Sequence, residues 1–249
     1  MGKRWVHGRR RMQETGSSEK VPDGCNGILV TSACLDSRTV TKSVVRVLHD
    51  YVPAFSLLRE ECATLEDELA ALTQDKGRLV AVPTGVRGFI FVGWARDPRY
   101  PDANTVVDCL RKALAEERSF YQVSRIYPVL VTSGFRTTEI HRGTNRVVSV
   151  YLGALENADS SIKDLYTKER PLLIKVSASV RHNTSCDVGV VEREVSNAAL
   201  AAAQALGWHV SIMPAGSDAF LIINVCKTTT YYTMRGDDCK VSYAAVVSQ

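Results

Sequence analysis

The feature that most constrains the fold is the order in which apolar patterns follow one another in the first half of the chain. The run 27–33 is apolar and β-branched, which predicts a buried strand. Asp36 or Ser37 can cap the helix that follows, because apolar residues then recur at helical spacing. Pro53 closes this helix, since proline cannot continue a helical hydrogen-bond ladder.

The same half of the chain continues with a second helix, a hairpin and a third helix. Residues 56–76 carry an apolar stripe on an acidic amphipathic pattern, which predicts a helix. Strand-like runs at 78–83 and 88–95 are separated by turn formers at 84–87, so a β-hairpin is predicted there. Residues 105–117 again have apolar residues at helical spacing.

The last element of this half is a strand over residues 123–132. It is predicted to be an edge strand, because Pro128 cannot donate to the ladder of a central strand. With it, the order of elements is the split βαβ order of a ferredoxin-like domain. We therefore expect a mixed α/β (α+β) protein whose ferredoxin-like domain covers residues 25–130 and follows a basic flexible tail at 1–24.

Positive charge is concentrated in that tail. Residues 1–20 hold six basic and two acidic side chains, which leaves 25 basic and 25 acidic residues in the rest of the chain. A nucleic-acid site on the body must therefore be a surface patch on which basic side chains are gathered, because the overall charge of the body does not attract phosphate. The tail is typical of a flexible basic arm or a nuclear-import segment, with a plain solvated terminus as the alternative.

The segment 133–170 is less regular. Residues 136–146 are polar and are predicted to form a loop. Residues 147–155 are compatible with a short strand or a helix, and residues 159–166 predict one or two helical turns.

A firm pattern returns after this segment. Residues 172–179 predict a strand, and Asp187 is a good cap for an alanine-rich helix over 188–206. Residues 219–226 form the most apolar strand, and 227–234 either extend it or pair with it as a hairpin. These elements indicate a second α/β unit in the C-terminal half.

Cysteine usage and the apolar runs point to an intracellular protein. The seven cysteines are odd in number and no pair has CxxC spacing, which supports neither a disulfide framework nor a zinc finger. Cys34, Cys109 and Cys226 lie inside apolar segments and are predicted to be buried free thiols, as in a reducing compartment. No apolar run approaches the ~20 residues of a membrane-spanning helix, and the N-terminus lacks the apolar stretch of a secretory signal.

Sequence signals for catalysis are few. The five histidines have no metal-ligand spacing, and the GxSxG, GxxxxGK[ST] and GxGxxG motifs do not occur. Cys186 lies near His182, which leaves a thiol enzyme as a weaker alternative. We therefore expect no cofactor and no metal.

Three stretches resemble one family. They are residues 27–32 (GILVTS), 120–129 (FYQVSRIYPV) and 174–200. The run 225–227 and the tyrosines at 231 and 232 are also similar to the family's last strand and the segment after it. In these residues the chain resembles the THUMP-domain proteins, in particular the stand-alone adaptor for tRNA cytidine acetylation. The chain departs from the family pattern at Lys227, where a second cysteine is usual, and a valine replaces the arginine often found where the family's helix begins.

The resemblance implies an order of domains and a function. A THUMP-like RNA-binding domain at 131–249 would follow the ferredoxin-like domain, and a catalytic domain usually comes next in the family. Because about ten residues remain after the last THUMP-like strand, we expect no such domain and a protein that is not an enzyme. The resemblance further implies that the chain binds the acceptor end of tRNA and presents tRNA to a separate RNA cytidine acetyltransferase, in the nucleus or nucleolus rather than the cytoplasm. A structural component of another ribonucleoprotein is the alternative.

Basic residues in the C-terminal unit are the main candidates for RNA contact. Lys175 and Arg181 lie on or just after the strand 172–179, and Lys227 follows the strand 219–226. Lys175 alternates with apolar neighbours, so it should face away from the core. Such cations would hold phosphates and make binding salt-sensitive, whereas solvated surface charges are the plain alternative.

Other candidates in this unit are polar, charged or aromatic. His182 and Asn183 precede a helix and could donate to ribose hydroxyls or bases, or simply cap that helix. Arg193 lies within the third stretch of the resemblance. Tyr231 and Tyr232 face opposite sides of a strand, so one is expected to stack on an unpaired base and the other to belong to the core.

The N-terminal domain supplies two further candidates. Arg87 lies at the tip of the predicted hairpin, and Arg125 precedes the link between the domains. A turn residue and a surface ion pair are the alternatives for these two positions.

Overall fold

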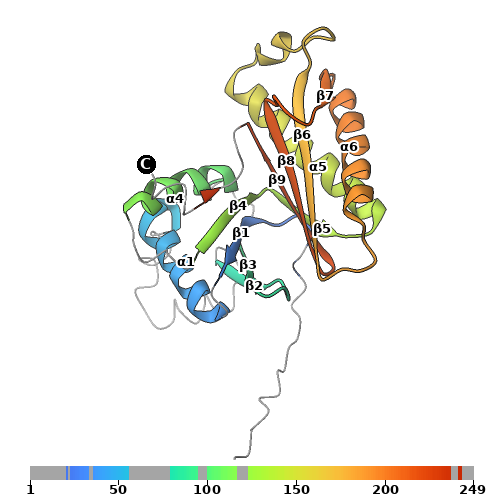
Figure 1. The fold of residues 1–249 in the computed structure, drawn as a ribbon. Helices are drawn as coiled ribbons and strands as arrows, with labels where there is room; N and C mark the ends of the chain where they lie inside the picture. The colour runs from blue at the N-terminus through green and yellow to red at the C-terminus, as the bar shows by residue number, and fades with distance from the viewer. Residues whose placement is uncertain are drawn as a thin grey trace, which may run out of the picture.

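The computed structural model describes residues 21, 23–33, 36–55, 79–94, 100–116, 123–236 and 241–242. They form two β-sheets, each with helices on one of its faces (Figure 1). The mixed α/β class predicted from the sequence is confirmed. Residues 1–20 and 22 of the tail, Cys34 and the helix predicted at 56–76 lie outside the described residues, and the division into domains at residue 130 stays a prediction.

The first sheet has the strand order β10-β4-β1-β3-β2, and every neighbouring pair is antiparallel. Helices α1 and α4 pack on it. The sequence β1, α1, β2, β3, α4, β4 is the split βαβ order, so the predicted order of elements is confirmed. The bounds are β1 Asn26–Ser32, α1 Ser37–Tyr51, β2 Val80–Pro83, β3 Phe89–Trp94, α4 Ala103–Glu116, β4 Val123–Val129 and β10 Val241–Ser242.

The prediction that residues 123–132 form one edge strand is wrong. The segment divides at Leu130 into β4, in the first sheet, and β5 (Val131–Gly134), in the second. β4 is also not an edge, because β10 pairs with it at Ile126 and Arg125. Pro128 lies beyond the two residues that β10 pairs with, so the missing N–H removes no bond from that pairing.

The second sheet has the order β5-β9-β8-β6-β7. Strand β6 runs parallel to β7 and β8, whereas β9 is antiparallel to both β8 and β5. Helices α5 and α6 pack together along one face of this sheet (Figure 1). The bounds are α5 Thr137–Ala158, the 3-10 turn η2 Ile162–Leu165, β6 Leu172–Arg181, α6 Val188–Ala205, β7 Val210–Ile212, β8 Ala219–Cys226 and β9 Thr229–Arg235.

The loop predicted at 136–146 is wrong, because these residues begin the long helix α5. The segment looked polar because only one side of the helix is buried. Ile140, Thr144 and Val147 lie on that side at helical spacing and are at most 4% exposed. Arg136 and Glu139 form the capping pair that starts the helix.

The remaining elements of the second unit match the prediction. The carboxylate of Asp187 accepts a hydrogen bond from the Val190 N–H at 3.0 Å and so caps α6 as expected. Helix α6 ends before Gly207, whose φ is +73°. Of the two options for residues 227–234, the hairpin is correct, with Lys227 in its turn at a φ of +54°. The short strand β7 was not predicted.

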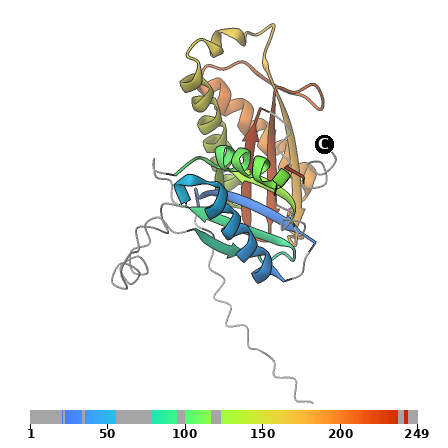
Figure 2. The ribbon, with the colours of Figure 1, turned by 90° about the vertical axis from the view of Figure 1, so that its left-hand side faces the viewer.

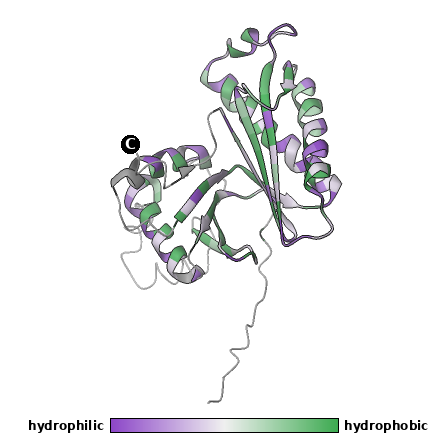
Figure 3. Ribbon diagram, viewed as in Figure 1, coloured by the Kyte–Doolittle hydropathy of each residue, from purple (hydrophilic) through white to green (hydrophobic). Residues whose placement is uncertain are grey.

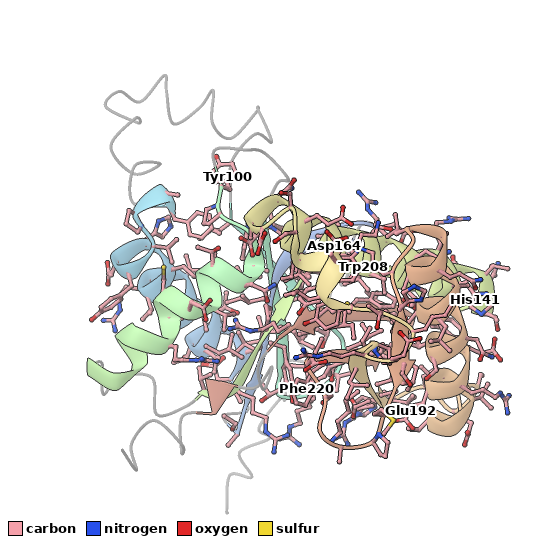
Figure 4. All side chains as sticks on the ribbon, turned by 90° about the horizontal axis from the view of Figure 1, so that it is seen from above. Tyr100, His141, Asp164, Glu192, Trp208 and Phe220 are labelled. Atoms are coloured by element: carbon pink, nitrogen blue, oxygen red, sulfur yellow. The ribbon has the colours of Figure 1, made fainter. Side chains whose placement is uncertain are left out.

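The strands of the two sheets cross steeply (Figure 2). The face of the second sheet that points away from its helices packs on the first sheet, and the Phe91 and Tyr231 rings lie 5.2 Å apart there. Phe220 lies at the same junction, as the view from above shows (Figure 4). Strands of both sheets are largely hydrophobic, whereas the outer sides of the helices are hydrophilic (Figure 3). In the described part of the chain, no helix combines the length and apolarity needed to cross a membrane.

Candidate nucleic-acid interface

Three strands of the second sheet end at one edge. β5, β6 and β8 run in the same direction, since each is linked to its neighbour by parallel pairing or through the antiparallel strand β9. Register places Arg181 opposite Cys226, and Cys226 and Gly134 both opposite Thr229. We call this border of the sheet the carboxyl edge. Helices α5 and α6 both begin just after it, so two helix N-termini point their N–H groups toward the same region.

Hydrogen bonds fix the two loops at the carboxyl edge. The Lys227 N–H donates to the Arg181 carbonyl at 2.9 Å, and the Asn183 side-chain amide donates to the Lys227 carbonyl at 2.6 Å. The other end of the Asn183 amide accepts from the Ser185 N–H at 3.0 Å. Asn183 therefore holds the loops in place, and its predicted role as a donor to RNA stays a prediction. His182 adopts a left-handed φ of +53° in the same loop and is exposed.

Cations from three segments lie at this edge. The side chains of Arg136, Arg181 and Lys227 are exposed there. The Lys227 side chain crosses the hairpin between β2 and β3, because a Cβ placed on Gly85 would lie only 2.6 Å from Lys227 Nζ. Arg87, exposed on that hairpin, therefore belongs to the same region although it comes from the first sheet.

Two carboxylates next to the carboxyl edge are used to start helices. Asp187 accepts the Val190 N–H, and Glu139 Oε2 accepts the Arg136 N–H at 3.1 Å. Counting Arg87, Arg136, Arg181 and Lys227 against these two acids leaves the edge with a formal charge of +2. The edge is thus a sorted positive patch on a body with balanced charge, as a phosphate-binding site requires.

The face of β6 that points away from the helices extends this patch. Ile174 and Val176 pack into the core beside the helices, whereas Lys175 points to the other side, as predicted. Lys175 and Arg181 share that side of the strand and are six residues, or roughly 20 Å, apart. Between them, the Ser179 hydroxyl donates to Asn224 Oδ1 at 2.8 Å.

Asn224 also leaves one polar atom without a partner. Its side chain is 4% exposed, and Nδ2 is buried with no hydrogen-bond partner among the described residues. A buried donor of this kind costs free energy unless a water or a ligand accepts from it.

The predicted stacking of a tyrosine on RNA is wrong for both residues. Tyr231 and Tyr232 are 1% and 0% exposed. Burial raises the pKa of each phenol, and the Tyr232 hydroxyl is paired with Ser133 Oγ at 2.8 Å. The physical reason is that β9 lies between two strands, with helices on one face and the first sheet on the other.

Two predicted residues lie away from the carboxyl edge. Arg125 is exposed on β4, where it pairs in register with Thr31 and Ser242. Arg193 lies on α6 and forms an ion pair with Glu194 at 3.7 Å. Glu194 also contacts His141 at 2.9 Å, on the side of the molecule remote from the first sheet (Figure 4).

The geometry does not favour a thiol nucleophile. Partial burial, with the Asp187 charge as a second cause, raises the pKa of Cys186, so the reactive thiolate is disfavoured. Cys226 is 1% exposed and free, which confirms the predicted buried thiol, and this burial raises its pKa to about 12. Cys109 is a free thiol that is partly exposed. In the described residues, no three His, Cys, Asp or Glu side chains come together as a metal site.

Sequence reasoning missed two parts of the edge. Arg136 was assigned to a loop, although Glu139 follows it at the three-residue spacing of a capping pair, which was the available signal. The contact of Lys227 with Gly85 joins segments about 140 residues apart, and no local pattern predicts it.

No protein-family model matches the chain, and no curated protein matches its sequence. Among solved structures, it is similar to PH1313 from Pyrococcus horikoshii Ot3, with 11% identity and a TM-score of 0.46 over 87% of this chain and 55% of that one. A 4-thiouridine synthetase in an RNA complex with bound ATP has 11% identity and a TM-score of 0.46, over 88% of this chain and 42% of that one. A protein described as a predicted N6-adenine-specific DNA methylase, from Listeria monocytogenes, has 12% identity and a TM-score of 0.42, over 84% and 40%.

These structures overturn the prediction that the chain is not an enzyme, because they include a synthetase and a protein described as a methylase. The chain spans about half the length of the structures it is similar to, from 40% to 55%. At these identities and TM-scores, the similarity carries no argument about substrate or partner.

Proposed function

We propose that the chain binds structured RNA at the carboxyl edge and acts in tRNA modification. One observation carries this proposal, namely the convergence of four cations and two helix N-termini at an edge whose acids are already used as helix caps. Backbone N–H groups at helix starts and guanidinium groups are both suited to phosphate oxygens.

The proposed mode of binding is positioning of the RNA backbone. Arg181, Lys227 and Arg87 come from the ends of rigid strands or a hairpin, so they present charge in a fixed arrangement. Contacts with phosphates hold an RNA in register without reading its sequence. Lys175 would extend the contact along the open face of β6, and its distance from Arg181 spans several nucleotides.

The finer assignment follows from the resemblance to the THUMP-domain proteins. The RNA would be tRNA, held near its acceptor end, and the modification would be cytidine acetylation by a separate RNA cytidine acetyltransferase, in the nucleus or nucleolus. By holding the RNA, the chain would raise the effective concentration of the modified arm at the catalytic centre. Co-purification tests this assignment, because an RNA acetyltransferase in the pull-down supports it and ribosomal or assembly proteins in its place refute it.

The RNA-binding proposal is tested with a charge-reversal variant, Arg181→Glu/Lys227→Glu. Affinity for tRNA, measured by fluorescence anisotropy at several salt concentrations, should fall by on the order of 100-fold, and the slope of log K against log salt should decrease by about 2. Both side chains are exposed, so the fold should tolerate the change.

The matched control is Lys168→Glu/Arg193→Glu, which reverses two exposed charges outside the carboxyl edge. It should change affinity less than threefold. Equal losses in the two variants would mean that only net charge matters. An unchanged affinity in a folded Arg181→Glu/Lys227→Glu protein would remove the carboxyl edge from the site.

A further inference from the structure

A pocket lies beside the second sheet, and Glu139 is the residue it shares with the carboxyl edge. Its volume is about 230 Å³, and it is bounded by the segment 23–24, strand β5 and the first half of α5. The residues that line it are Asp23, Gly24, Val131, Thr132, Ser133, Glu139, Arg142, Gly143 and Arg146.

The side chains of two arginines in this pocket have no hydrogen-bond or ion-pair partner among the described residues. Arg142 and Arg146 are one helical turn apart on α5, and neither makes a hydrogen bond or ion pair with any residue that the structure describes. Like charges at this spacing destabilise a helix by roughly 0.2–0.5 kcal/mol. The pair therefore works against the stability of α5 and points to a role in binding.

The backbone around the pocket is shaped to admit Arg146. Gly24 has a φ of +78°, and a Cβ placed on it would lie only 2.3 Å from Arg146 Nη1. The Gly24 N–H donates to the Thr132 carbonyl at 2.7 Å, which fixes this glycine beside β5. The guanidinium group thus lies across a backbone position that only glycine leaves open.

The carboxylates of the pocket do not neutralise the arginines by direct contact. Glu139 Oε2 accepts the Arg136 N–H at 3.1 Å, so this side chain is turned toward the start of α5. Its Oε1 atom remains available to accept a hydrogen bond from a ligand. The pocket thus offers two guanidinium donors, which suit an anion, and two carboxylates, those of Asp23 and Glu139, which can accept from a hydroxyl or amino group.

We propose that this pocket binds a phosphate ester, with Arg142 and Arg146 holding the phosphoryl oxygens and Glu139 accepting a hydrogen bond from the esterified part. The guanidinium fork matches the spacing of phosphate oxygens. The volume is below the ~300 Å³ at which drug-sized ligand sites begin, so the phosphate and the few atoms next to it fit inside, and the rest of a larger ligand extends out of the pocket. The site goes beyond the proposed RNA contact, because its two arginines are not among the cations of the carboxyl edge and only Glu139 is shared between the two sites.

Calorimetric titration tests the proposal, with inorganic phosphate and cytidine 5′-monophosphate as ligands. The full chain should bind both, and the variant Arg142→Gln/Arg146→Gln should bind at least tenfold more weakly. The control Arg170→Gln/Arg193→Gln removes two exposed charges outside the pocket and should bind like the original protein. Absence of binding at millimolar ligand, or equal binding by Arg142→Gln/Arg146→Gln, would overturn the proposal.

Titrations with two RNA ligands identify the source of the phosphate. If the ester is the end of an RNA, a short RNA with a 5′-phosphate should bind more tightly than the same RNA with a 5′-hydroxyl, and Arg142→Gln/Arg146→Gln should abolish the difference. If the ester is a free nucleotide, the monophosphate binds and the two RNAs do not differ. Either outcome supports binding of a phosphate ester by Arg142 and Arg146.

Two further variants keep the test specific. Gly24→Ala should weaken phosphate binding by displacing Arg146, with melting temperature measured to separate this effect from unfolding. Arg181→Glu/Lys227→Glu should leave binding of phosphate in the pocket unchanged. Failure of the phosphate site is therefore distinguishable from failure of the RNA-binding proposal.

Discussion

The two sheets differ in how their strand ends are distributed. In the first sheet every pair is antiparallel, so neighbouring strands end at opposite borders. The loops that follow these strands are therefore divided between the two borders. In the second sheet β5, β6 and β8 run the same way, and their carboxyl ends and the following helix starts meet at one border. Ligands of α/β sheets bind at carboxyl ends for this reason. The comparison teaches that strand direction, rather than total charge, locates the candidate site.

The sheets also differ in what a substitution should cost. The first sheet contributes one hairpin to the carboxyl edge and otherwise serves as packed framework, on which β8 and β9 rest. The second sheet carries most of the exposed cations at that edge. Changes in the first sheet should therefore mainly reduce stability, and changes at the edge of the second should mainly reduce binding.

The largest expected effect is on stability, in the first sheet. In Gly27→Ala, the added Cβ would lie 2.4 Å from the Val92 carbonyl oxygen and 2.8 Å from the Phe91 ring. Because the carbonyl belongs to the paired strand β3, it cannot move freely, and the free energy of unfolding should fall by about 3 kcal/mol. Urea denaturation measures this.

A glycine of the second unit serves as the contrast. In Gly153→Ala on α5, the added Cβ meets nothing within 4 Å, so the helix should gain about 0.5–1 kcal/mol. A loss of stability in Gly153→Ala, or none in Gly27→Ala, would contradict the packing described for the two sheets.

The next effect is on RNA affinity and separates two arginines of the first sheet. Arg87→Glu should weaken tRNA binding roughly tenfold, because Arg87 is two residues from Gly85, against which the Lys227 side chain lies, and should lower the salt slope by more than 1. Arg125→Glu should change affinity less than twofold, since Arg125 lies away from the carboxyl edge. Anisotropy measures both, and equal losses would show that the part of β4 around Arg125 also contacts RNA.

A smaller effect concerns the cap of α6. Asp187→Ala removes the acceptor of the Val190 N–H and should lower the free energy of unfolding by about 1 kcal/mol. The same change removes a negative charge from the carboxyl edge, so RNA affinity should rise slightly. Asp187→Asn should keep most of the stability and show the same rise. Weaker RNA binding by a folded Asp187→Asn protein would argue that the edge is not where phosphates bind.

The smallest effect near neutral pH comes from groups buried where the sheets meet. Burial raises the pKa of Cys226 to about 12 and raises the pKa of Tyr231 as well. The folded state therefore keeps protons that the unfolded state loses above about pH 9, so stability should be full below pH 9 and fall as the pH rises toward 12. Urea denaturation at pH 8 and pH 10 measures the decrease in the free energy of unfolding between the two pH values. This decrease should be smaller in Cys226→Ala than in the original protein.

Much of the fold follows from local pattern. The strands β1, β6 and β8 are continuous apolar runs, and α6 has a cap and an alanine-rich repeat, so each was predicted near its observed bounds. The first half of helix α5 was predicted as a loop, because its first turns expose polar residues and bury only one narrow side, and residues 147–155 were left open between a strand and a helix. Arg181 and Lys227 were predicted from the ends of their strands. The burial of Tyr231 depends on Phe91, far away in the sequence, and composition cannot reveal it.

The Lys227 side chain lies against Gly85 in the hairpin between β2 and β3. This hairpin therefore sets the distance between Arg87, which it carries, and the cations of the second sheet. The hydroxyl of Thr84 donates to the Phe89 carbonyl at 2.9 Å, so the length of this loop is held from within. One residue inserted there would shift Arg87 relative to Arg181 by a few ångströms, about half the separation of neighbouring phosphates on an extended strand. Loop length, as much as residue identity, would then set which RNA shapes the protein accepts.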